Sequence, residues 1–489
     1  MAQLAPREIA RDFIFLSSAR IFSLGISFVR SLFIPRLLGP TSYGVWKSLG
    51  IVQSYMQFSD LGAIAALKRE IPLLTSRGDE ASLATARDVA FFVNHVVVLL
   101  AAIGLMAGSF FVPEADYARA LRFFVLLLYA RQVNIFLEKL LFWRKDFAYA
   151  SRLNLVLAVT ESTLAIGGTI LFGLDGLIIG TFVGYGSVAL LQLRRIGFDI
   201  GYAWKWSVYR ELVKIGFPSH VNGLLYNLMT SIDRMLILPI LGLEELGLYA
   251  LAMTINDYLF MLSYALGNVL SPRLVETWSE NESMDEIRPI VELPTLGIAL
   301  AAPVVLGAVW FAVGSAIEVL LPRFTGAIVP LRILLVGTYF SSLHRGLSSF
   351  FLAIRKQGRL FPIYGGAILL NAGAVWSVLQ AGYGIQAVAA STATVMGLFS
   401  FTMIVTARWF FREGLAGHLR FIALLVSPLA WAAVCVTGGT MAAGTATVAS
   451  AGPIARSAAG LAVFGLLYAP MIYAGYRYLT SRSPGTATP

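Results

Sequence analysis

Five arginines occur inside long apolar stretches of the sequence, where a charged side chain is least expected: Arg20, Arg30, Arg131, Arg234 and Arg345. An arginine at the centre of a membrane-spanning helix costs about 2.5–3.5 kcal/mol on insertion scales, so such residues nearly always face protein or water. The guanidinium is permanently charged, and its planar fork of donors matches phosphate oxygens. We therefore predict that these five arginines bind an anionic, phosphate-bearing solute.

Small polar residues accompany these arginines at intervals of three or four, which places each set on one face of a helix. One set surrounds Arg20 and Arg30 and consists of Ser17, Ser23, Ser27 and Ser31. A second set precedes Arg234 and consists of His220, Gly223, Asn227 and Thr230. The pattern predicts a water-filled cavity. As an alternative, Arg20 and Arg30 could extend to the two membrane interfaces.

Three acids are candidates for coupling to a proton or cation: Glu138, Glu161 and Asp257. A desolvated carboxyl holds a proton more readily than one in water, so it can change charge during a transport cycle. Each acid also has a structural alternative. Glu138 could pair with Arg131, Glu161 could be a protonated and hydrogen-bonded carboxyl, and Asp257 could serve an interhelical contact.

Residues for metal binding or catalysis are scarce in this sequence. Cys435 is the single cysteine, and the four histidines are scattered along the chain. This rules out an internal disulfide or a cysteine-based metal cluster and makes a metal site improbable. We predict no metal, no cofactor and no catalytic residue.

The composition is that of a membrane protein. Hydrophobic residues make up 57% of the chain and charged residues only 13%, whereas a soluble domain carries about 25% charged residues. Apolar stretches of roughly 18–25 residues recur from end to end, which is the length a helix needs to cross a bilayer. The net charge of +10 comes mainly from short loops, so it does not indicate nucleic-acid binding.

An all-α polytopic membrane protein with about fourteen transmembrane helices follows from these stretches. We place the helices at 13–35, 43–66, 88–112, 119–142, 148–172, 175–194, 216–239, 245–271, 291–313, 328–353, 359–380, 385–407, 420–443 and 457–478. The loops after even-numbered helices hold most of the Lys and Arg, although the loop after 245–271 is acidic. The positive-inside rule then places both termini in the cytoplasm.

An internal repeat divides the chain. The segment RSLFIPRLLGPTSYGVW, which begins at Arg30, aligns with RMLILPILGLEELGLYA, which begins at Arg234. With a one-residue gap, this alignment makes Arg30 and Arg234 equivalent and pairs Gly39 with Gly242. Further on, FWRKDF aligns with AIRKQG and pairs Arg144 with Arg355. Two parallel, pseudo-symmetric six-helix lobes are expected, at 1–208 and 209–415, followed by a two-helix hairpin and cytoplasmic tail at 416–489.

The stretches RLLGPTSYGVWKSL, FSDLGA and SIDRMLILPILGLEELGLYALA resemble the polysaccharide-export (Wzx-like) branch of the multidrug/oligosaccharidyl-lipid/polysaccharide (MOP) exporter superfamily. The resemblance implies alternating access through a cavity between two lobes. It also implies a cargo of undecaprenyl-pyrophosphate-linked oligosaccharide, moved from the cytoplasmic to the periplasmic leaflet of a bacterial inner membrane. A polysaccharide polymerase and chain-length proteins are expected partners, for exopolysaccharide, capsule or O-antigen synthesis.

Three other functions remain open at this point. A cation-coupled multidrug exporter and a peptidoglycan-precursor flippase belong to the same superfamily. A membrane glycosyltransferase or polysaccharide polymerase is a different class, but such enzymes place their chemistry in large external loops. The external loops expected here are short and plain, so the sequence favours a transporter over an enzyme.

Overall fold

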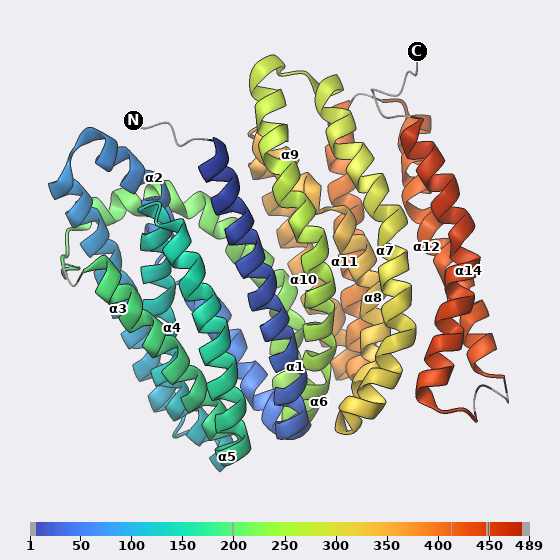
Figure 1. Ribbon diagram of the computed structural model, residues 1–489, viewed down its shortest axis with the longest axis horizontal. Coiled ribbons are helices and arrows are strands. Elements are labelled where there is room, and N and C mark those ends of the chain that lie inside the picture. The colour runs from blue at the N-terminus through green and yellow to red at the C-terminus, as the bar shows by residue number, and fades with distance from the viewer. Residues whose placement is uncertain (1–5, 198–199, 412, 446–447, 449, 482–489) are drawn as a thin grey trace. The chain divides into compact units, whose positions relative to one another are not determined.

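The computed structural model describes the backbone of residues 6–197, 200–411, 413–445, 448 and 450–481, and their side chains except those of 6–19, 219, 260–272 and 345. In these ranges the regular structure is helical (Figure 1). Its helices are α1 (Pro6–Met56), α2 (Ala63–Arg77), α3 (Glu80–Gly108), α4 (Ala115–Trp143), α5 (Phe147–Ile196), α6 (Trp206–Asn281), α7 (Met284–Leu320), η1 (Pro322–Ala327), α8 (Ile328–Leu343), α9 (Arg345–Ala353), η2 (Gln357–Arg359), α10 (Leu360–Gln380), α11 (Ile385–Arg408), η3 (Trp409–Phe411), α12 (Leu415–Ala443) and α14 (Pro453–Thr480).

Each of the long helices α1, α5 and α6 contains two of the predicted spans, and a sharp kink joins the two spans. The backbone leaves the helical region at Gly39 in α1 (φ 75°), at Phe172 and Gly173 in α5, and at Gly242 in α6 (φ 85°). Glycine reaches positive φ without a Cβ clash, so the chain can turn there without a loop. Among the described residues, eleven helical runs are long and apolar enough to cross a membrane, and three of these contain the kinks. The prediction of an all-α protein with about fourteen spans is confirmed.

Two predicted spans are interrupted rather than continuous. Residues 57–62 form turns, with Leu61 and Gly62 at positive φ, so the span predicted at 43–66 ends at Met56 and helix resumes at Ala63. A Cβ on Gly62 would lie 2.6 Å from the carbonyl carbon of Gly216. This close backbone approach is a tertiary contact that local sequence patterns do not reveal. The span predicted at 328–353 is divided at His344 into α8 and α9.

The chain forms two compact units, Met1–Ser231 (unit 1) and Ile232–Pro489 (unit 2). In unit 1, α5 packs against both α1 and α4. In unit 2, α8 packs against α11, and α7 packs against α14. The boundary lies inside α6, within the span predicted at 216–239. The division into 1–208, 209–415 and 416–489 remains a prediction.

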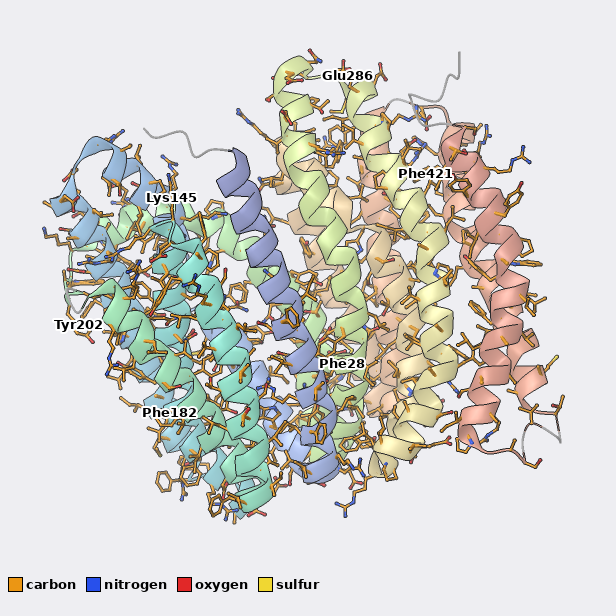
Figure 2. All side chains as sticks on the ribbon, in the orientation of Figure 1. Phe28, Lys145, Phe182, Tyr202, Glu286 and Phe421 are labelled. Atoms are coloured by element: carbon orange, nitrogen blue, oxygen red, sulfur yellow. The ribbon has the colours of Figure 1, made fainter. Side chains whose placement is uncertain are left out.

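The turn after α4 has a counterpart after α9. Lys145 (φ 62°) and Arg355 (φ 58°) both adopt positive φ, and each follows a helix end with the same hydrogen bonds. Lys145 N donates to Phe142 O and Asp146 N to Leu141 O, while Arg355 N donates to Leu352 O and Lys356 N to Phe351 O. Lys145, labelled in Figure 2, therefore matches Arg355. The predicted pairing of Arg144 with Arg355 was wrong by one residue.

Helices α12 and α14 lie side by side and both contact α7 (Figure 1). Phe311 of α7 packs in a buried cluster with Cys435 of α12 and with Phe464 and Tyr468 of α14. At the end of α11, Arg408 forms ion pairs with Glu292 and Glu413. Its guanidinium lies 4.2 Å from the ring centre of Phe421 of α12, a residue labelled in Figure 2. Within unit 2, the terminal hairpin is thus joined to α7 by apolar packing and to α11 by the contacts of Arg408.

Candidate functional site: a polar cavity in unit 1

A cavity of about 340 Å³ opens among α1, α4 and α5 in unit 1. Helix α1 contributes Arg20, Ser23 and Ser27 to its lining, and the other polar lining residues are Glu138, Ser151, Asn154 and Glu161. The polar face predicted for the first span therefore meets the faces of α4 and α5 that carry acids. Three predicted site residues, Arg20, Glu138 and Glu161, come together here.

Arg30 and Glu161 form an ion pair that joins α1 to α5. The side chain of Arg30 is 24% exposed and that of Glu161 is 12% exposed, so the pair is only partly screened by solvent. Taking both charges out of water is costly, and their mutual attraction offsets that cost only while both partners are present. The pair places a cation and a titratable acid at the edge of the cavity.

Glu138 has a different partner from the one weighed in the sequence. Its Oε1 accepts a hydrogen bond of 2.8 Å from Asn154 Nδ2. The guanidinium of Arg131 lies 5.5 Å from the ring centre of Tyr185 in α5. Arg20 is exposed at the cavity. The side chain of Arg345 lies outside the described residues.

Unit 2 holds a second polar cluster, centred on the buried carboxyl of Asp233. Tyr249 Oη donates to Asp233 Oδ2 at 2.5 Å, and the backbone N–H of Arg234 donates to Oδ1 at 2.7 Å. Thr392 Oγ1 lies 3.5 Å from Asp233 Oδ2 and 3.5 Å from Asn371 Oδ1. The Arg234 guanidinium approaches the same carboxyl, with Nε 3.8 Å from Oδ1.

The kinks give a structural register for the repeat, and it differs from the sequence alignment. Nine residues before Gly39 stands Arg30, and nine residues before Gly242 stands Asp233. Both helices are uninterrupted over that stretch, so nothing can absorb the one-residue gap that aligned Arg30 with Arg234. The equivalence of the two arginines is therefore corrected: Arg30 corresponds to Asp233.

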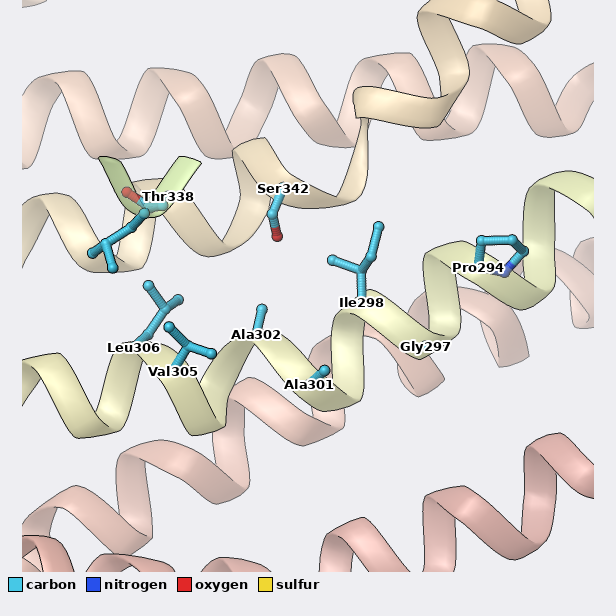
Figure 3. Close-up of a pocket in the computed structure, with 10 residues that line it drawn as sticks. Pro294, Gly297, Ile298, Ala301, Ala302, Val305, Leu306, Thr338 and Ser342 are labelled. Atoms are coloured by element: carbon cyan, nitrogen blue, oxygen red, sulfur yellow. The ribbon is translucent and has the colours of Figure 1, made fainter. Parts of the chain in front are cut away.

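The predicted coupling residue Asp257 is exposed and lies eight residues after Tyr249 on α6. Its neighbour Asn256 accepts a hydrogen bond from Thr338 of α8. Thr338 also lines an apolar cavity of about 290 Å³, whose other lining residues come mainly from α7, among them Gly297, Ala301 and Ala302 (Figure 3). Small residues on α7 leave this space open.

Asp60 and His220 form a contact that the polar pattern of the sequence did not predict. Asp60 Oδ2 accepts from the backbone N–H of Ile64 at 2.5 Å, which caps α2 after the break. His220 Nε2 lies 3.2 Å from Asp60 Oδ1. Both residues lie in unit 1, so this contact ties the first part of α6 to α2.

Sequence reasoning also missed the roles of Tyr249, Asn371 and Thr392. All three are fully or almost fully buried. Each of them is a polar residue inside an apolar helix. Because a buried polar group needs a hydrogen-bond partner, this was the signal by which they could have been found. Within the described side chains, no three His, Cys, Asp or Glu residues are placed to hold a metal ion.

Comparison with solved structures shows the fold of MOP superfamily transporters. An inward closed structure of the Lipid II flippase MurJ has a TM-score of 0.70 at 14% identity, covering 95% of this chain and 100% of that one. An inward-facing multidrug resistance MATE family transporter of the MOP superfamily has a TM-score of 0.65 at 12% identity, covering 84% of this chain and 98% of that one. A MOP superfamily transporter from Pyrococcus furiosus gives 0.57 at 12% identity, covering 84% and 96%.

The sequence comparisons give the family. No curated protein matches the chain at a significant level. The family model described as "Polysaccharide biosynthesis protein" matches residues 33–322, which is more than half of the chain. The resemblance found in the sequence is thereby confirmed, and this multi-pass membrane chain belongs to the polysaccharide biosynthesis protein family and has the MOP transporter fold.

Proposed function

We propose that the protein is a flippase, not an enzyme, that moves an undecaprenyl-pyrophosphate-linked oligosaccharide from the cytoplasmic to the periplasmic leaflet of a bacterial inner membrane. The observation that carries the proposal is a charged cavity among membrane helices in a member of a polysaccharide biosynthesis family. The product would serve exopolysaccharide, capsule or O-antigen synthesis. A polymerase and chain-length proteins would act next on the same material.

The arginines of unit 1 would bind the pyrophosphate. Arg20 is exposed at the cavity, and Arg30 lies beside it with Glu161 as its partner. Two guanidinium groups can each offer paired donors to phosphate oxygens. A bound pyrophosphate would compete with Glu161 for Arg30. Glu161, released from its cation, would then take up a proton, which links cargo binding to a change of charge.

The distribution of basic residues gives the expected orientation of the protein in the membrane. The loops rich in Lys and Arg would face the cytoplasm, with both termini on that side. Arg20 lies toward the N-terminal end of α1 and Glu138 toward the C-terminal end of α4, and both of these ends would face the cytoplasm. Cargo would therefore reach the arginines from the cytoplasmic leaflet, where such intermediates are assembled.

A gene deletion with complementation tests the proposal. The deletion strain should lose surface polysaccharide and accumulate lipid-linked oligosaccharide in the cytoplasmic leaflet, and the wild-type gene should reverse both effects. Rescue of a strain depleted of its peptidoglycan-precursor flippase would favour that cargo instead. Normal surface polysaccharide in the deletion strain, with no second gene of this family present, contradicts the proposal.

A further inference from the structure

A pocket of about 430 Å³ lies at one end of unit 2, where three chain reversals meet. Its lining comes from α6 just after the Gly242 kink, from η1, and from the turn between α10 and α11. We call it the turn pocket. Its size falls within the roughly 300–1,000 Å³ typical of small-molecule sites. It shares no residue with the polar cavity of unit 1.

Three side chains give the turn pocket its chemistry. Tyr383 is 60% exposed, Glu245 is half-buried and Gln386 is exposed. None of the eight lining residues is basic. An anion such as phosphate would meet the carboxylate of Glu245 with no lining cation to balance it. A purely apolar ligand would leave the carboxylate and the amide without partners.

We propose that the turn pocket is a sugar-binding subsite for an uncharged residue of the transported glycan. The face of an aromatic ring carries partial negative charge and attracts the C–H groups on the apolar face of a sugar. Glu245 accepts hydrogen bonds from hydroxyl groups, and the Gln386 amide both donates and accepts them. This inference rests on the proposed function, because a glycan cargo is what brings sugar to this end of the helices.

The position of the pocket suits the release side of the membrane. It lies beside the turn after α10, and the loops with few basic residues, this one among them, are predicted to face away from the cytoplasm. The polar cavity of unit 1 would hold the pyrophosphate end of the cargo. The turn pocket would recognise a sugar, so each unit would carry a site for a different chemical group of the cargo.

Gly384 offers a way to block the pocket without disturbing the fold. A Cβ built on Gly384 meets no heavy atom within 4 Å, and its backbone (φ −86°, ψ −170°) is extended, which any residue can adopt. In Gly384→Trp the indole would enter open space. In contrast, a Cβ on Gly326 would lie 3.0 Å from Leu248 Cδ1, so substitution there would also test packing.

Saturation-transfer NMR with the full-length protein in phosphatidylcholine nanodiscs tests the inference. The probes are the methyl glycosides of glucose, galactose, rhamnose and N-acetylglucosamine. At least one should receive saturation from the wild type, with affinity at least about fivefold weaker in Tyr383→Ala and close to wild type in Tyr383→Phe. Gly384→Trp should abolish the signal. Tyr476→Ala, which removes a tyrosine of similar exposure (65%) on α14, is the matched control.

Two results overturn the inference. One is that no glycoside binds, or that binding is the same in Tyr383→Ala and Gly384→Trp as in the wild type. The other is that the lipophilic cation tetraphenylphosphonium binds at Tyr383 and Glu245 while the glycosides do not. Failure of the proposed function is a separate result, because it appears as normal surface polysaccharide in the deletion strain whatever the nanodisc experiment shows.

Discussion

The cavity of unit 1 has Arg20, Glu138 and Glu161 in its lining, whereas the cavity of unit 2 in Figure 3 is lined by Gly297, Ala301 and other uncharged residues. The two repeats nevertheless kink at equivalent glycines and turn at equivalent residues. The backbone plan is thus shared, although the two cavities lie between helices that are not repeat mates: α1, α4 and α5 in unit 1, and mainly α7 and α8 in unit 2. Repeat symmetry in this protein predicts where the chain bends, and it does not predict where charge lies.

The kink glycines and the matched turns allow individual residues of the two units to be compared. Nine residues before the kink glycine, unit 1 has Arg30 and unit 2 has Asp233; sixteen residues after the matched turn, unit 1 has Glu161 (161 − 145) and unit 2 has Asn371 (371 − 355). The arginine–glutamate pair of unit 1 is replaced in unit 2 by an aspartate and an asparagine. Both of these contact Thr392. The first pair is suited to exchanging partners with an anion, while the second cluster holds a carboxyl in place.

Arg30→Ala should produce the largest effect, and Arg30→Lys should restore part of it. Removal of a hydrogen bond to a charged group costs roughly 1.5–3 kcal/mol, which corresponds to about a tenfold or greater loss of affinity. We expect surface polysaccharide to fall by at least about tenfold in the alanine variant, with protein level measured by immunoblot. Arg30→Ala leaves the carboxylate of Glu161 without its cation, which lowers stability. The double variant Arg30→Ala/Glu161→Gln removes that charge as well, so it should recover protein stability but not transport. Normal polysaccharide from that double variant would show that the pair has no part in cargo binding.

Tyr249→Phe tests whether the cluster of unit 2 is structural. Tyr249 and Asp233 are buried, and loss of the phenol leaves a carboxyl oxygen short of a donor at a cost of roughly 1–3 kcal/mol. The variant should unfold at a lower temperature in detergent while the purified, folded fraction keeps its transport rate. Tyr473→Phe, on an exposed tyrosine, should leave the unfolding temperature unchanged. A variant of normal stability but without transport would place Tyr249 in the transport mechanism instead.

Gly39→Ala and Gly242→Ala should destabilise the protein to a similar extent, because the two kinks are equivalent. Their backbones lie near φ 80° and ψ 180° (φ 75°, ψ 173° and φ 85°, ψ −174°), a region that only glycine occupies readily and that costs other residues about 1–3 kcal/mol. The control is Gly50→Ala, in a regular helix with space around its Cβ, which should be neutral or slightly stabilising. Unfolding temperatures in detergent would measure all three. Clearly unequal losses at Gly39 and Gly242 would break the equivalence.

The spans could be predicted from the sequence because length and hydropathy alone decide whether a helix crosses a bilayer. The kink glycines were also visible as repeat mates. The partners of the charged residues could not be predicted. A helical pattern shows which residues share one face of a helix, but it does not show which face of a neighbouring helix packs against them. Arg30 and Glu161 are 131 residues apart, and only the packing of α1 on α5 brings them together. The Arg30–Arg234 pairing failed because a sequence alignment tolerates a gap that an unbroken helix cannot absorb.

Cysteine labelling compares the access of water to the two cavities, and we expect its variants to change transport least. In a Cys435→Ala background, we expect Ser27→Cys in unit 1 to react with a charged, membrane-impermeant methanethiosulfonate reagent, because serine, asparagine and carboxyl groups beside it attract water. Ala301→Cys in unit 2 should react slowly with that reagent and faster with an uncharged, lipophilic maleimide, because an apolar cavity of this kind stays dry. Leu466→Cys, on an exposed part of α14, reports the reactivity of a lipid-facing position. Each substitution replaces a small or exposed side chain, so transport should remain near wild type. If Ala301→Cys and Ser27→Cys react equally fast with the charged reagent, both cavities are wet, and the divergence between the units would then concern charge alone and not access to water.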